Sequence, residues 1–252
     1  MKQAFLHFKK LLEEKQNFVK DELRDNYLQG AMQVLSENHE LYKTVVNNET
    51  ILHLVLKQLQ FRNIHKVRMT KLKFLLIDIL ENSTVDMINQ QNSEGDTAIH
   101  IMLKNEQFSV GVMDMLHEKG ASFTIKNNAG DMPIHLVAKS ENLDDLKFII
   151  GYMNKEEVDS KNQKNGDTAL LISTRSQKIN NVYFLLEQNA DVFEINFKGE
   201  SPKNIAVKIL NEERSETAQQ IYNIIELFEE KQKATRKIED MVSLNKKEKD
   251  FD

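Results

Sequence analysis

The sequence predicts an all-α, mostly helical repeat solenoid, and three observations support this prediction. A short phrase that begins with Gly and an acidic residue recurs at intervals of 35, 36 and 33 residues. The chain of 252 residues has only 8 Gly and 2 Pro, too few for a turn-rich sandwich or barrel. Apolar residues between the copies recur at helical spacing. Such short modules cannot bury their apolar faces alone, so neighbouring modules must stack.

The recurring phrase is clearest in Gly95-Asp96-Thr97-Ala98-Ile99-His100, Gly130-Asp131-Met132-Pro133-Ile134-His135 and Gly166-Asp167-Thr168-Ala169-Leu170-Leu171. An earlier copy begins at Asn48 and a weaker one at Gly199. We expect the glycines at hairpin tips, where the backbone needs a positive φ. Asn suits the start of such a turn, which we place at Asn92, Asn127, Gln163 and Asn196. Helix N-caps are expected at Thr50, Thr97, Thr168 and Ser201.

These five copies resemble ankyrin repeats, whose period is about 33 residues and whose phrase is Thr-Pro-Leu-His. The resemblance covers residues 47–211, with repeats near 47–91, 92–126, 127–162, 163–195 and 196–211. It implies two short helices per repeat, joined by β-hairpin-like loops. It also implies a structural role for His53, His100 and His135, each bonding the hairpin of a neighbouring repeat. The fifth repeat keeps the least of the phrase.

Both ends of the chain lack the phrase but keep apolar residues at helical spacing. We therefore expect an N-terminal helical cap over residues 1–46, and a C-terminal helical cap with a charged tail over residues 212–252. In the C-terminal cap, a stripe covers the fifth repeat: Ile221, Ile224, Ile225 and Phe228. A further helix is expected around Ile238, Met241 and Val242.

No catalytic, cofactor or metal pattern accompanies the repeats. The chain has no Cys, and no phosphate-binding loop, kinase signature or dinucleotide fingerprint is present. The net charge of −5 gives no general attraction to nucleic acid or anionic lipid, and the apolar stretches, such as residues 74–77, are far too short to span a membrane. We expect a cytoplasmic, non-enzymatic protein with no cofactor and no membrane or nucleic-acid partner.

Two rows of charge recur with the repeats. An acid precedes each cap position: Glu49, Asp96, Asp131, Asp167 and Glu200. A basic residue follows each cap position by seven residues: Lys57, Lys104, Lys139, Arg175 and Lys208. By the resemblance, both rows face the partner-binding surface. Either the rows neutralise each other, or they set the register of a complementary partner. In the second case, Lys104→Glu with Lys139→Glu weakens binding and leaves the melting temperature nearly unchanged.

The first repeat carries an insertion that is rich in cations. Residues 57–73 contain no acid, and their basic residues are Lys57, Arg62, Lys66, Arg68, Lys71 and Lys73. This segment is either a solvated lengthening of two helices or a contact for an acidic partner.

The expected function is non-catalytic recognition of another protein across the concave face of the array. The Glu-rich C-terminal region and the Asn- and Lys-rich composition resemble secreted effectors of intracellular bacteria, which implies a host-protein partner, a role in virulence and a place in the host cytoplasm. Two alternatives stay open: an intracellular scaffold or inhibitor, and an enzyme whose active site lies in the caps or in the 57–73 insertion. The sequence leaves the oligomeric state open.

Overall fold

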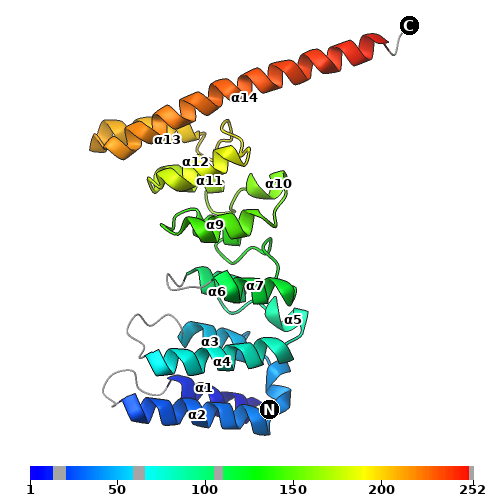
Figure 1. Ribbon diagram of the computed structural model, residues 1–252, viewed down its shortest axis with the longest axis vertical. Helices are drawn as coiled ribbons and strands as arrows, with labels where there is room; N and C mark the ends of the chain where they lie inside the picture. The colour runs from blue at the N-terminus through cyan, green and yellow to red at the C-terminus, as the bar shows by residue number, and fades with distance from the viewer. Residues whose placement is uncertain (14–20, 59–65, 105–109, 250–252) are drawn as a thin grey trace. The chain divides into compact units, whose positions relative to one another are not determined.

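Helices form most of the structure. The computed structural model describes residues 1–13, 21–58, 66–104 and 110–249 (Figure 1). Its helices are α1 (Lys2–Glu13), α2 (Asp21–Glu37), η1 (His39–Lys43), α3 (Ile51–Gln58), α4 (Lys66–Asn82), α5 (Val85–Ile88), α6 (Ala98–Leu103), α7 (Val110–Glu118), α8 (Pro133–Val137), α9 (Leu143–Ile150), α10 (Lys155–Val158), α11 (Ala169–Arg175), α12 (Ile179–Glu187), α13 (Pro202–Glu213) and α14 (Glu216–Lys249). Within these ranges there is no β-strand, and the prediction of an all-α repeat solenoid is confirmed.

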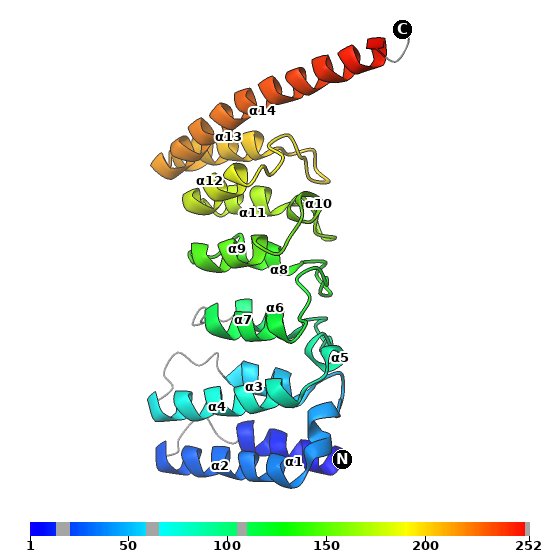
Figure 2. The same cartoon turned by 45° about the vertical axis from the view of Figure 1, so that its right-hand side comes forward.

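The chain forms two compact halves, a first half of Met1–Leu136 and a second half of Val137–Asp252. In the first half, α3 packs against α1, α4 and α6. In the second half, α11 packs against α12 and α13, and α14 packs against α12 and α13. Each half is therefore a stack of helix pairs (Figure 2). The boundaries proposed for the caps and the five repeats stay predictions.

The hairpin of the second repeat shows why a glycine recurs. The N–H of Asn92 donates to the carbonyl of Asp96 at 3.0 Å, and the Asn92 side chain accepts from the N–H groups of Glu94 and Asp96. Gly95 lies at the tip with φ +73°, and a Cβ there would stand 2.4 Å from the Asn128 side chain. Only glycine tolerates both the left-handed backbone and this close approach of the next repeat.

The hairpin of the fourth repeat is one residue longer than that of the second. Asn162 donates its N–H to the carbonyl of Asp167, and its side chain accepts from the N–H groups of Asn165 and Gly166. The expectation that Gln163 starts this turn was therefore wrong. The extra residue explains why the glycine spacing reaches 36 here, while the turn-starting asparagines Asn127 and Asn162 keep a spacing of 35.

The repeated histidine is structural where its contacts are described. The Nδ1 of His100 accepts from the N–H of Thr97 at 3.2 Å, and its Nε2 lies 3.0 Å from the carbonyl of Asp131 in the next hairpin. Because a carbonyl only accepts, Nε2 carries the proton. The predicted bond between the histidine and a neighbouring hairpin is confirmed for His100.

The junction between the first two repeats is less complete. The Nδ1 of His53 accepts from the N–H of Thr50 at 3.0 Å, but its buried Nε2 forms no well-aligned hydrogen bond with a described residue. The buried Nδ2 of Asn92 also lacks a partner there. Two polar atoms at this junction are therefore removed from water without full compensation.

The C-terminal region forms one uninterrupted helix. Ile221, Ile225 and Phe228 of α14 are buried, whereas Ile224 is only half-buried. The expectation of a separate helix around Ile238, Met241 and Val242 was wrong, because they lie in α14 and are exposed. No Gly or Pro interrupts the sequence between Glu216 and Lys249, so nothing ends the helix earlier.

Acid is expected to destabilise the first half through His53. Burial lowers the pKa of His53 to about 4, against an opposing effect of the Gln90 backbone. Between pH 6.5 and about 4 the unfolded chain therefore binds a proton that the folded chain does not. The free energy of unfolding keeps its full value above pH 6.5 and decreases as the pH falls. At pH 5 the decrease is about 2 kcal/mol. Urea unfolding at pH 7 and pH 5 measures this loss, which His53→Gln should reduce. Equal pH dependence in both proteins would contradict it.

Two glycine substitutions are expected to change stability in opposite directions. Gly95→Ala should lower the free energy of unfolding by about 1–3 kcal/mol, because it strains a positive φ and meets Asn128. Gly111→Ala, at an exposed position in the first turn of α7 with no atom of a described residue within 4 Å of the new Cβ, should raise it by up to about 1 kcal/mol. Thermal unfolding of both variants tests this, and a stabilising Gly95→Ala would contradict the close approach.

Candidate protein-binding site

Three of the recurring acid–base positions form ion pairs within their own repeat. Each acid lies just before a first helix, and its cation lies at the end of that helix, so one or two helical turns bring them together. The Nζ of Lys57 lies 2.6 Å from Glu49, and Lys104 pairs with Asp96. The guanidinium of Arg175 lies 2.9 and 3.1 Å from the two oxygens of Asp167. The two rows therefore neutralise each other at these three repeats.

The aspartates of these pairs lie inside the protein. The side chains of Asp96 and Asp167 are only 2% and 3% exposed. Each carboxylate also accepts a bond of 2.8 Å from the next hairpin, Asp96 from Asn127 and Asp167 from Asn196. The acids therefore join neighbouring repeats, and the cations above them reach the solvent.

Glu49 differs because it binds two lysines. The Nζ atoms of Lys9, on α1, and of Lys57 each lie 2.6 Å from one of its oxygens. Burial alone would raise the pKa of Glu49, but the bonds from Lys57 and Lys9 outweigh it and lower the pKa. The bond to Glu49 raises the pKa of Lys9. Glu49 thus ties the N-terminal helix to the first repeat.

The remaining members of the rows are arranged differently. Glu200 accepts from Asn196 at 2.9 Å, which lowers its pKa, and it lies 3.4 Å from Arg175 of the preceding repeat. Lys139 and Lys208 are exposed, and neither forms an ion pair with a described residue of the second half. Asp131 is half-buried, and its carbonyl accepts from His100.

The basic insertion is only partly described. Arg62 lies outside the described residues. Lys66 and Arg68 lie in the first turn of α4, but their side chains are outside the described part of the structure. Their proposed contact with a partner stays a prediction.

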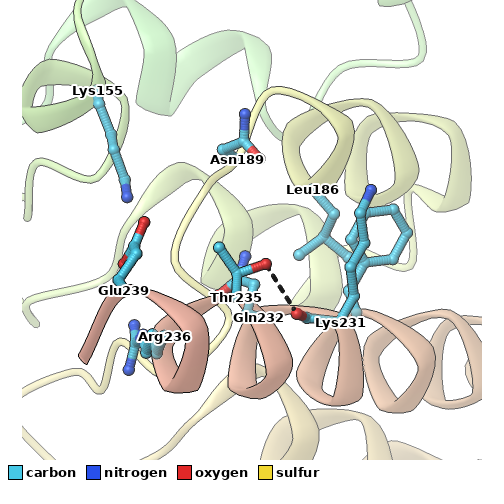
Figure 3. A pocket seen from close by; sticks show the side chains of 9 residues that line it. Lys155, Leu186, Asn189, Lys231, Gln232, Thr235, Arg236 and Glu239 are labelled. Carbon is cyan, nitrogen blue, oxygen red and sulfur yellow. Dashed lines mark hydrogen bonds between the residues drawn. The ribbon is translucent and has the colours of Figure 1, made fainter. Parts of the chain in front are cut away.

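A cavity of about 370 Å³ in the second half was missed by sequence reasoning (Figure 3). Its cationic side chains are Lys155 of α10 and Lys231 and Arg236 of α14. Gln232 holds its wall in place by donating to the carbonyl of Ala190 at 2.8 Å and accepting from the N–H of Val192. The lining residues come from α10, α12, α14 and the turn after α12, which share no motif, so no local sequence pattern predicts the cavity.

The described residues hold no group of three or more His, Asp and Glu side chains arranged to bind a metal ion. In the same ranges, no helix is both long enough and apolar enough to cross a lipid bilayer.

Comparison with known proteins places the repeats in a family. A family model described as ankyrin repeats matches residues 107–196 with three copies. A Caenorhabditis elegans protein named "Intracellular phospholipase A2" is 24% identical over 143 residues, which are 55% of this chain and 13% of that protein. The chain thus spans only a small part of this relative. Residues 107–196 thus match ankyrin repeats, and the hairpin of the fourth repeat described above lies within this range.

Proposed function

We propose that the chain is a non-catalytic module that binds an acidic surface of another protein through its basic row. Ankyrin repeats support protein–protein interaction, and this family is the first argument for the proposal. The observation that carries it is the position of the cations. Lys57, Lys104 and Arg175 are 35%, 37% and 41% exposed, above carboxylates that are 12%, 2% and 3% exposed. A partner would therefore meet positive charge.

The paired cations are well prepared for binding. Each is held by a carboxylate that is itself fixed by burial or by a second bond, so little side-chain entropy is lost when a partner docks. Arg175 bonds Asp167 at 2.9 and 3.1 Å, and its contacts with Glu200 are longer, at 3.4 and 3.5 Å. A carboxylate of a partner would replace Glu200 at this guanidinium. Glu94 and Glu200, which lie 3.5 and 3.4 Å from Lys104 and Arg175, mark where carboxylates of a partner would bind.

The alternative of an enzyme has less support. The cavity of Figure 3 is one place in the second half that is large enough for a small substrate. In its lining, the hydroxyl of Thr235 donates to the carbonyl of Lys231 at 3.1 Å, so its proton is already held by the backbone. The name of the nematode relative describes that protein, of which this chain covers 13%. A bacterial effector role and a scaffold or inhibitor role stay predictions of the sequence.

Free and paired cations are expected to respond differently to charge reversal. Lys139→Glu with Lys208→Glu should leave the free energy of unfolding within about 0.5 kcal/mol and reduce partner binding. Lys104→Glu should instead lower the free energy of unfolding by about 1–3 kcal/mol, because it leaves the buried Asp96 carboxylate beside a second negative charge. The structure thus makes Lys104 unsuitable for the double reversal proposed from sequence.

Urea unfolding measures the stability, and capture of proteins by the immobilised chain measures the binding. Lys10→Glu, an exposed cation on α1, is the matched control for the change of charge. Capture of the same proteins in the same amounts by wild type and by the Lys139→Glu/Lys208→Glu variant would contradict the proposed role of the basic row.

A further inference from the structure

Helix α14 has two apolar faces, and only one of them packs on the repeats. On the packed face, Ile221, Ile225 and Phe228 are buried, and Gln232 bonds to the Ala190 carbonyl. At 100° per residue, Leu227, Ala234, Ile238 and Met241 lie on the opposite side from Gln232. The three large side chains of this opposite side, Leu227, Ile238 and Met241, are 63%, 62% and 51% exposed.

The exposed face has the spacing of a coiled-coil seam. We call it the outer seam, and its members are Ile224, Leu227, Lys231, Ala234, Ile238 and Met241. Their spacings alternate between three and four residues over about 27 Å of helix. Helix α14 also runs on beyond the ends of α12 and α13, which leaves the second part of the seam open (Figures 1 and 2). A helix uses such a pattern to pack against another helix.

We propose that the outer seam joins two copies of this chain in an antiparallel helix pair. In this register, Ile224 meets Met241, Leu227 meets Ile238 and Lys231 meets Ala234 of the other copy. Two-fold symmetry makes each of these three contacts occur twice, which gives six layers of paired side chains. Every large apolar residue of the seam then has a partner. The only charged member, Lys231, faces the smallest side chain, so its stem can pass outward while its ammonium group stays in water.

Charge complementarity selects the second copy and its direction. Glu230 and Lys237 flank the outer seam on the same side, and both are exposed. Neither forms an ion pair with a described residue of the second half. In the antiparallel register, Glu230 of each copy faces Lys237 of the other, which gives two ion pairs. In a parallel pair, the heptad would place Thr235 opposite Glu230 and Val242 opposite Lys237. Neither charge would then form an ion pair with the other copy.

The expected dimer is weak and specific. A single lysine inside a seam sets register at a cost in stability, and exposed ion pairs each add only about 0–1 kcal/mol. Sedimentation equilibrium of the full chain should therefore show a dimer that dissociates on dilution. Ile238→Glu should raise its dissociation constant at least about tenfold, because it buries a charge between apolar residues. Phe74→Glu changes a side chain of nearly the same exposure, 63% against 62% for Ile238, on α4 and should leave the dimer intact.

A charge exchange tests the direction of the pair. Glu230→Lys and Lys237→Glu should each weaken self-association, because each places like charges opposite one another twice. An equal mixture of the two variants should associate again, because both opposite-charge pairs return between unlike chains. Association unchanged in both single variants, or a mixture as weak as its components, would overturn the antiparallel register.

Cysteine cross-linking gives a second test, because the chain has no cysteine of its own. Leu227→Cys mixed with Ile238→Cys should form a disulfide-linked dimer under mild oxidation, and each variant alone should not. Cross-linking of each variant alone would indicate a parallel pair and overturn the proposal. A wild-type chain that stays monomeric at every concentration would also overturn it, and would assign the outer seam to a helix of a different protein.

Discussion

A buried carboxylate that serves two neighbours at once is the interaction on which the described repeats depend. Asp96 and Asp167 each bind a cation at the end of their own first helix and an asparagine amide of the next hairpin. An ionised carboxylate removed from water is costly unless it is paired and hydrogen-bonded. Here both requirements are met only when the next repeat is in place. The same bond therefore fixes the stacking of two repeats and the position of a surface cation.

Backbone contacts between hairpins act with this carboxylate. The N–H of Asn128 donates to the carbonyl of Glu94, and the N–H of Phe197 donates to the carbonyl of Asn165. Glycine permits these approaches, since a Cβ at Gly95 or Gly166 would stand about 2.5 Å from atoms of the next hairpin. At the junction of the first two repeats these contacts are incomplete, and the buried Nε2 of His53 and Nδ2 of Asn92 form no hydrogen bond with a described residue. Stability is therefore distributed unevenly between the junctions.

Both proposed binding surfaces consist of side chains that the stacking of the repeats leaves exposed. Stacking buries Asp96 and Asp167, so Lys104 and Arg175 are the exposed members of these two pairs. Helix α14 divides its apolar residues between the repeats and the solvent, and the outer seam is the part that stacking does not use. The first surface suits a partner with acidic side chains. The second suits an apolar helix, and the pattern of α14 itself supplies one.

The sequence by itself determined the repeat, because period, hairpin glycine and helix cap are set by local backbone chemistry that recurs in most copies. It also revealed both rows of charge. Only the tertiary structure decided that Asp96 and Asp167 are buried, because burial depends on the hairpin that follows each of them by about thirty residues. The longer hairpin at Asn162, the cavity beside Arg236 and the two faces of α14 likewise came from packing between distant segments. Local patterns record what a residue's own turn or helix requires, whereas exposure is fixed by neighbours that the chain brings together only on folding.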